Sequence, residues 1–239
     1  MALIDNIQAY WKLEGNSTDA TGNGHNGTDT GMSYNASYGK IGQGANFVNT
    51  YPNNNSSFTA TVGDYGTFTI NLWVKSSYAG GNDSGFVTVG NWSTTGHFQF
   101  KYNVTAGYIT VEGYGDNPAT ELHATTSLFN GTYNMVTVTY KTSATPTIEV
   151  FVNGSSVASQ TYTSLPTINF SSATTYVGTW LIGTNYRGMV SGYMDEIGIW
   201  NVVLGSSDIT ALYNAGAGLQ YPFTITAPAH NLSLLGVGA

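Results

Sequence analysis

Apolar and polar residues alternate along several segments of the chain. The clearest run reads FTINLWVK over residues 68–75, and similar runs cover residues 97–104, 135–140 and 148–152. Successive side chains of a strand point to opposite faces, so each run predicts a strand with one face in a core. Such strands, separated by Gly- and Asn-rich turns, predict an all-β antiparallel β-sandwich of the jelly-roll type.

Two local signals sharpen this prediction. Asn153-Gly154 separates IEVFV from SSVASQTY and predicts a hairpin with a type I′ turn. Apolar residues at helical spacing after Ser206 or Ser207 predict one short helix, which we expect Gly216 to end. We expect His97, which alternates with the Phe98 face, to lie at the surface.

The length of 239 residues suits one sandwich domain. We expect this domain to cover residues 1–223. Residues 224–239 differ, because they are apolar, uncharged and end in a Gly-rich sequence. They are either a disordered tail or an arm that docks on a neighbouring subunit.

Composition excludes several classes of partner. Only 8% of the residues are charged and the net charge is −7, with six Lys and Arg residues in total. Binding to nucleic acid needs clustered basic residues, so we expect no nucleic-acid partner. The chain has no cysteine and no apolar run of membrane-spanning length. Its start lacks a secretion signal, so we expect a cytoplasmic origin, although a trimmed leader would look the same.

Three blocks of sequence carry a family resemblance. The first is AYWKLE with the loop DATGNGHNGT at residues 19–28, the second is the run at 68–75, and the third joins MVTVTY, IEVFVNG and GYMDEIGIW to the helix. In this order they resemble the laminin-G-like branch of the concanavalin A-like lectin/glucanase superfamily. The resemblance implies a jelly roll with one short C-terminal helix, in a family that mostly binds glycans or builds surface assemblies. Tyr133-Asn134-Met135 departs from it, because relatives commonly have Trp-His-His there.

The resemblance also implies a structural calcium ion. In relatives it often ties the opening loop to the strand that bears the Asp-Glu step, so the candidate ligands are Asp19, Asn23 and Asp195. Calcium prefers hard oxygen ligands, which a Gly- and Asn-rich loop can supply. The alternative is that Asp19 makes an Asx-turn and Asp195 accepts backbone hydrogen bonds.

Glycan binding requires aromatic faces for stacking and polar groups for the hydroxyls. Gly-rich loops offer such residues, and we predict a ligand site from Trp92, Tyr114, Asp116, Asn117, Tyr186 and Arg187. Packing in a core or an interface is the alternative role for each. Trp11, Trp73 and Trp200 lie in predicted strands, so we assign them to packing.

The sequence does not favour an enzyme. Retaining glucanases of this superfamily place two carboxylates about 5–5.5 Å apart, usually in a Glu-x-Asp-x-x-Glu strand, which is absent here. Asp195 and Glu196 are adjacent, so we expect them on opposite sides of a strand.

Two functions fit these observations. The first is a virion surface protein, namely a phage capsid decoration or fibre-associated subunit, whose tail contacts other virion subunits and whose lectin-like domain adheres to glycans. The second is a secreted or cell-surface carbohydrate-binding module. A glycoside hydrolase is the weakest alternative.

Overall fold

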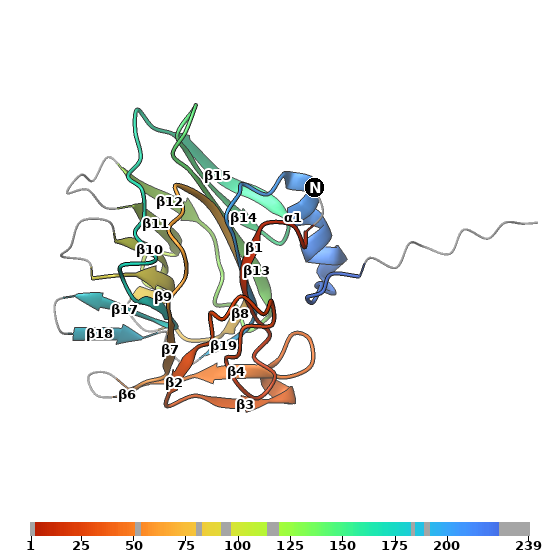
Figure 1. The fold of residues 1–239 in the computed structure, drawn as a ribbon. Coiled ribbons are helices and arrows are strands. Elements are labelled where there is room, and N and C mark those ends of the chain that lie inside the picture. Colours follow the sequence, from red (N-terminus) through yellow and green to blue (C-terminus); the bar gives the residue numbers. More distant parts are fainter. Residues whose placement is uncertain are drawn as a thin grey trace, which may run out of the picture.

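Two antiparallel β-sheets pack face to face in this protein (Figure 1). The computed structural model describes residues 3–50, 54–79, 83–91, 97–113, 120–182, 185–188 and 192–224. A single short α-helix in these residues lies outside one of the sheets. The predicted β-sandwich with one C-terminal helix is therefore confirmed.

The first sheet has the order β15-β14-β13-β8-β19-β4-β3, and β1 also pairs with β19. All of its pairs are antiparallel. Its strands are β1 (Ile7–Trp11), β3 (Ser33–Asn35), β4 (Gly44–Phe47), β8 (Thr67–Ser76), β13 (Asn134–Lys141), β14 (Thr147–Val152), β15 (Ser155–Thr161) and β19 (Gly192–Trp200).

The second sheet has the order β12-β11-β10-β9-β16-β7-β2. Its strands are β2 (Thr28–Thr30), β7 (Ser57–Ala60), β9 (Asp83–Val89), β10 (Phe98–Asn103), β11 (Tyr108–Gly113), β12 (Glu121–Thr125) and β16 (Thr175–Val177). Two short hairpins complete the described strands: β5 (Asn49–Thr50) with β6 (Asn54–Asn55), and β17 (Thr179–Ile182) with β18 (Asn185–Gly188).

The main core lies between the two sheets and uses the predicted faces. Phe68, Ile70, Leu72 and Val74 of β8 belong to it, as do alternate residues of β10, β13 and β14. Burying each large apolar side chain contributes about 1.5–3 kcal/mol, so this layer drives the packing of one sheet on the other.

A second apolar cluster covers part of the outer face of the first sheet. Tyr10, Trp73 and Trp200 lie in it under α1 (Ser206–Tyr213), which contributes Ile209 and Leu212. The packing role predicted for the strand tryptophans is confirmed for Trp73 and Trp200 here and for Trp11 in the main core.

The helix is present, but its caps differ from the prediction. Gly205 is the N-cap and forms no side-chain hydrogen bond, so neither Ser206 nor Ser207 has that role. The α-helix ends at Tyr213, and Asn214 takes the left-handed conformation expected of Gly216 (φ 47°). A 3₁₀ turn, η3 (Asn214–Gly216), follows at once.

The predicted Asn153-Gly154 hairpin joins β14 to β15. Both residues have positive φ, 52° and 80°, as a type I′ turn requires. The Asn153 side chain also accepts a hydrogen bond from Met135 N at 2.9 Å, which ties the turn to β13.

The outer face of the second sheet is covered at β10 rather than exposed. His97 is 1% exposed, so its predicted surface position is wrong, and its neighbours Gln99 and Lys101 are also buried. Lys101 Nζ lies 3.1 Å from Asp83 Oδ2 and 4.6 Å from the ring centroid of Trp180 in β17. Alternation in β10 identified the polar face correctly, but it could not reveal what covers that face.

No helix within the described ranges has both the length and the apolar character needed to cross a membrane. Residues 225–239 lie outside the described part of the chain, so the docking role of the tail stays a prediction.

Candidate functional site

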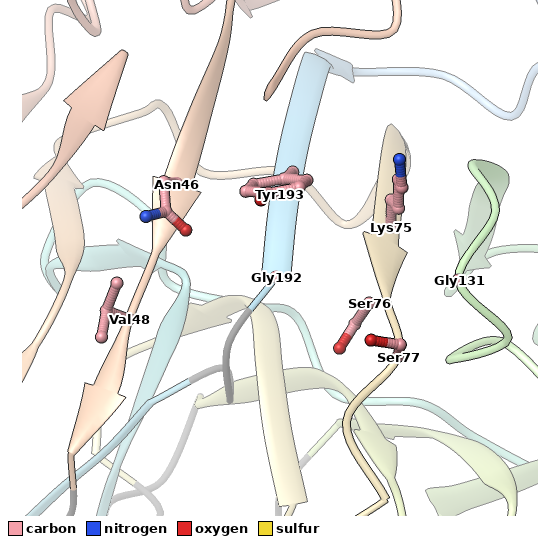
Figure 2. A pocket seen from close by; sticks show the side chains of 8 residues that line it. All are labelled: Asn46, Val48, Lys75, Ser76, Ser77, Gly131, Gly192 and Tyr193. Atoms are coloured by element: carbon pink, nitrogen blue, oxygen red, sulfur yellow. The ribbon is translucent and has the colours of Figure 1, made fainter. Parts of the chain in front are cut away.

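A groove of about 510 Å³ opens on the outer face of the first sheet, on the part that α1 does not cover (Figure 2). Three strands of that sheet, β4, β19 and β8, and the turn before β13 form its walls. The residues that line it are Asn46, Val48, Lys75, Ser76, Ser77, Gly131, Gly192 and Tyr193.

Strand register places three of these side chains in one row. Tyr193 of β19 pairs with Asn46 of β4 on one side and with Lys75 of β8 on the other. Figure 2 shows the Tyr193 ring between the Asn46 amide and the Lys75 amine. Neighbouring strands are about 4.8 Å apart, so the row spans roughly 10 Å, the scale of one sugar ring with its substituents.

A further tyrosine covers one face of the Tyr193 ring. Tyr38, in the 3₁₀ turn η1 (Ala36–Tyr38), stacks on Tyr193 with ring centroids 4.8 Å apart and 17° between the planes. The Tyr133 hydroxyl donates a hydrogen bond to the Tyr38 carbonyl oxygen and thereby holds η1 in place. Burial, followed by the nearby Asp195, raises the pKa of Tyr133 well above its ordinary value, so this hydroxyl remains a donor at neutral pH.

The groove also presents polar groups that are not used inside the protein. The Asn46 amide and the exposed Ser77 hydroxyl form no hydrogen bond with any part of the described chain. Ser76 differs, because its hydroxyl accepts a hydrogen bond from Tyr78 N at 3.1 Å. An aromatic face beside a free amide, a free hydroxyl and an amine is suited to binding a polyhydroxylated ligand.

Gly131 shapes the edge of the groove. It has φ +80°, a conformation that L side chains rarely adopt, and its N donates to the Ser76 carbonyl oxygen at 2.8 Å. This contact fixes the turn before β13 against the end of β8.

The residues predicted to bind calcium are engaged in hydrogen bonds of the opening loop. Asp19 accepts bonds from the backbone N–H groups of Tyr10, at 3.0 Å, and His25, at 3.1 Å. A third bond, from Thr21 N at 3.0 Å, makes the Asx-turn of the alternative interpretation. The Asn23 amide nitrogen donates to Gln8 O at 2.9 Å, which ties the opening loop to β1.

Asp195 has different partners. Its Oδ2 accepts hydrogen bonds from Lys40 N at 2.7 Å and Ile41 N at 2.9 Å, and its Oδ1 accepts one from Glu196 N at 3.0 Å. No group of three His, Cys, Asp or Glu side chains in the described residues could hold a metal ion. This donor set does not fit a calcium ion shared by Asp19, Asn23 and Asp195, and calcium at these residues stays a prediction that the geometry does not support.

The prediction that Asp195 and Glu196 lie on opposite sides of a strand is wrong, because β19 has a β-bulge at this step. The β19–β8 register shifts between Asp195 and Gly198, and Glu196 has φ +52°. Glu196 accepts hydrogen bonds from the Tyr10 hydroxyl and, at 2.6 Å, from Gln220 Nε2. Both carboxyl groups therefore lie on the outer face of the first sheet, because the extra residue of a bulge interrupts strict alternation.

These two carboxyl groups are fully buried, each 0% exposed. Burial raises the pKa of Asp195 to about 8, with a further contribution from Glu196, and burial raises that of Glu196 to about 7. Raised carboxyl pKa values occur at catalytic sites, but a general acid must also reach its substrate. Here the carboxyl groups instead connect β19 to the loop at Lys40 and to the C-terminal segment at Gln220.

The predicted ligand site is not assembled within the described residues. Trp92, Tyr114, Asp116 and Asn117 lie outside them. The described strand ends next to these residues are neighbours, because Phe98 pairs with both Val89 and Gly113. Tyr186 and Arg187 lie in β18, paired along the backbone with Leu181 and Trp180. Sugar binding by these six residues stays a prediction.

Sequence reasoning missed the groove around Tyr193. The one available signal was Lys75, a charged residue on the same face of β8 as Trp73. The row with Asn46 depends on the order and register of three strands from distant parts of the chain, which no local pattern encodes.

Comparison with known sequences places this chain in a wider group. A family model described as the concanavalin A-like lectin/glucanases superfamily matches residues 44–210. A search of curated proteins gives no match.

Solved structures share the fold. The binding domain of botulinum neurotoxin DC, in complex with rat synaptotagmin II, matches with a TM-score of 0.69 and 14% identity over 89% of this chain and 52% of that one. A second structure concerns the cell entry of botulinum neurotoxin type C, which depends on interaction with two ganglioside molecules. It matches with a TM-score of 0.68 and 13% identity over 89% of this chain and 52% of that one. This chain therefore spans about half the length of these neurotoxin chains.

A third structure has nearly the same extent as this chain. Domain 4 of AbnA, a GH43 extracellular arabinanase from Geobacillus stearothermophilus, in complex with arabinotriose, matches with a TM-score of 0.65 and 19% identity over 86% of this chain and 97% of that one. At these identities the likeness shows a common fold.

Proposed function

Because this chain belongs to the concanavalin A-like lectin/glucanase superfamily, we propose that it is a non-catalytic, lectin-like domain that binds a glycan in the groove around Tyr193. The observation that carries the proposal is the row Asn46–Tyr193–Lys75, with Tyr38 stacked beside it. A sugar ring can place its apolar face on the side of the Tyr193 ring that Tyr38 leaves uncovered, while its hydroxyls meet the Asn46 amide and the Ser77 hydroxyl.

The comparison with AbnA supports this proposal. Its domain 4 has the same fold over nearly its whole length, and its structure was solved in complex with arabinotriose. A sandwich of this size is thus compatible with binding a short saccharide.

Burial of the acidic pair supports a non-catalytic role. Hydrolysis of a glycosidic bond requires two carboxyl groups that flank the bond in an accessible site. Asp195 and Glu196 lie side by side at 0% exposure, with their oxygens bonded to the loop at Lys40, to Tyr10 and to Gln220. A sugar chain cannot reach them without unfolding part of the sheet.

We expect Tyr193→Ala to abolish or severely weaken glycan binding. Removing an aromatic stacking surface from a small, open site removes much of its apolar contact, and Tyr38 also loses its stacking partner. A glycan array followed by isothermal titration calorimetry measures the change. Tyr108→Ala, on β11 of the other sheet, is the matched control and should leave affinity unchanged. If Tyr193→Ala and the unmodified protein bind the glycan with equal affinity, the glycan does not bind in this groove.

For the biological setting, we propose a virion surface protein, either a capsid decoration or a fibre-associated subunit. The low charge content, at 8%, and the exposed hydroxyl-rich edge strand β15 suit an outer particle face. A secreted or cell-surface carbohydrate-binding module is the alternative.

Immunogold labelling of particles and cells from the source culture distinguishes these settings. We expect gold at regular positions on phage-like particles. Labelling confined to cell surfaces would favour the cell-surface module and contradict the virion role. An unrelated antibody on the same grids provides the control for background labelling.

A further inference from the structure

Lys75 is an unusual residue in this groove. Its Nζ lies 5.6 Å from the ring centroid of Tyr133 and 5.9 Å from that of Tyr193, so it sits between two aromatic faces. Within the described chain, no Asp or Glu carboxylate pairs with it, whereas Lys101 has Asp83 at 3.1 Å. The chain has only six Lys and Arg residues and a net charge of −7.

The acidic residue that acts on Tyr133 in this groove directs its oxygens elsewhere. Asp195, which acts on Tyr133, directs its carboxyl oxygens to the backbone N–H groups of Lys40, Ile41 and Glu196. The cation of Lys75 therefore faces the groove with no counter-charge from the described residues.

A neutral sugar does not need this cation. The Tyr193 ring, the Asn46 amide and the Ser77 hydroxyl already offer stacking and hydrogen bonds to uncharged hydroxyls. A lysine ammonium adds three donors and a full positive charge, and it forms its strongest hydrogen bonds with anionic oxygens. The two tyrosine faces also restrict the position of the amine, which lowers the entropy lost when it binds an anion.

We propose that the groove selects an acidic saccharide, one whose sugar ring carries a carboxylate, such as a hexuronate or a sialic acid. The ring lies on Tyr193, its carboxylate meets Lys75, and a hydroxyl on the opposite side meets Asn46, as the order of these side chains in Figure 2 allows. This inference rests on the proposed glycan-binding function of the same groove.

Two matched pairs of probes test the inference by titration calorimetry: trigalacturonate with its methyl ester, and sialyllactose with lactose. The members of the first pair share rings and linkages and differ in charge. We expect the acidic member of at least one pair to bind about tenfold more tightly, the effect of one charge-assisted hydrogen bond. This preference should decrease as sodium chloride increases, because salt screens the attraction.

Variants identify the residue responsible. Lys75→Gln should remove the preference by weakening the binding of the acidic probe far more than that of its neutral partner, since only the acidic probe loses the attraction to a positive charge. Lys141→Gln, at the far end of β13, removes one positive charge elsewhere and should preserve the preference. Thermal unfolding of each variant checks that its fold is intact.

The possible failures are distinguishable. Equal affinity for the acidic and neutral members of both pairs, or an unchanged preference in Lys75→Gln, would overturn the acidic-ligand inference and leave the glycan-binding proposal standing. If neither these probes nor a glycan array shows binding that Tyr193→Ala removes, both proposals are wrong.

Discussion

The folded state should lose several kcal/mol of stability as the pH rises from about 5 to about 9, because the buried carboxyl groups of Asp195 and Glu196 lose their protons. Burial raises the pKa of Asp195 from 3.8 to about 8 and that of Glu196 from 4.5 to about 7. A carboxyl group whose pKa is higher in the folded state binds its proton more tightly there. The stability that this group contributes is fully present below its pKa in the unfolded state, near 4. It is lost as the pH rises through its pKa in the folded state.

Urea unfolding across this pH range measures the effect. Each group contributes a slope of up to about 1.4 kcal/mol per pH unit between its two pKa values. The double variant Asp195→Asn, Glu196→Gln keeps the shape of both side chains and should flatten the profile. If that variant does not fold, Glu196→Gln alone should reduce the slope, because glutamine still accepts a hydrogen bond from Tyr10.

Glu149→Gln provides the control, because Glu149 is a partly exposed carboxyl group on β14. Its profile should match that of the unmodified protein. Stability that stays constant or increases between about pH 5 and 8 would contradict the raised pKa values. The same would hold if the double variant kept the original slope.

Trp73→Ala should destabilise the protein by about 3–5 kcal/mol, the usual cost of truncating a large buried aromatic residue. Trp73 is 2% exposed, stacks on Tyr213 with ring centroids 5.8 Å apart, and has Lys40 Nζ 4.7 Å from its ring. Its loss leaves a cavity under α1, and the helix is too short to be stable without this packing.

Chemical unfolding of Trp73→Ala and Trp73→Phe measures the cost. Phenylalanine fills part of the space, so its effect should be clearly smaller. Val157→Ala, at an exposed site on β15 (42%), should change the free energy of unfolding by less than about 0.5 kcal/mol. A loss below about 1 kcal/mol for Trp73→Ala would show that α1 contributes little to the stability of the fold.

The sequence carried most of the information about the sandwich. Alternation in β8, β10, β13 and β14 predicted which side chains enter the core, because the two-residue period of a strand is a local property. Asn153-Gly154 predicted a turn for the same reason, since positive φ at two successive residues restricts the residue types there.

Features set by several strands together could not be predicted in this way. Alternation placed Asp195 and Glu196 on opposite faces, but the bulge in β19 brings both to one face, and it arises from the pairing with β8. Likewise, Asn46, Tyr193 and Lys75 come from three strands, so only tertiary pairing makes them neighbours. The burial of His97 depends on what lies over the second sheet, which its own strand does not encode.

The central position of β19 has a consequence for the folding route. This strand is the last in sequence among those described, yet it pairs with β1, β4 and β8, all far earlier in the chain. The ribosome releases β1 long before its partner exists, and pairing of such distant segments is slow because a long loop must close first. The pairs β15-β14-β13-β8 and β4-β3 can form earlier, but the first sheet is completed only when β19 joins them and β1, after nearly all of the described strands have been synthesised.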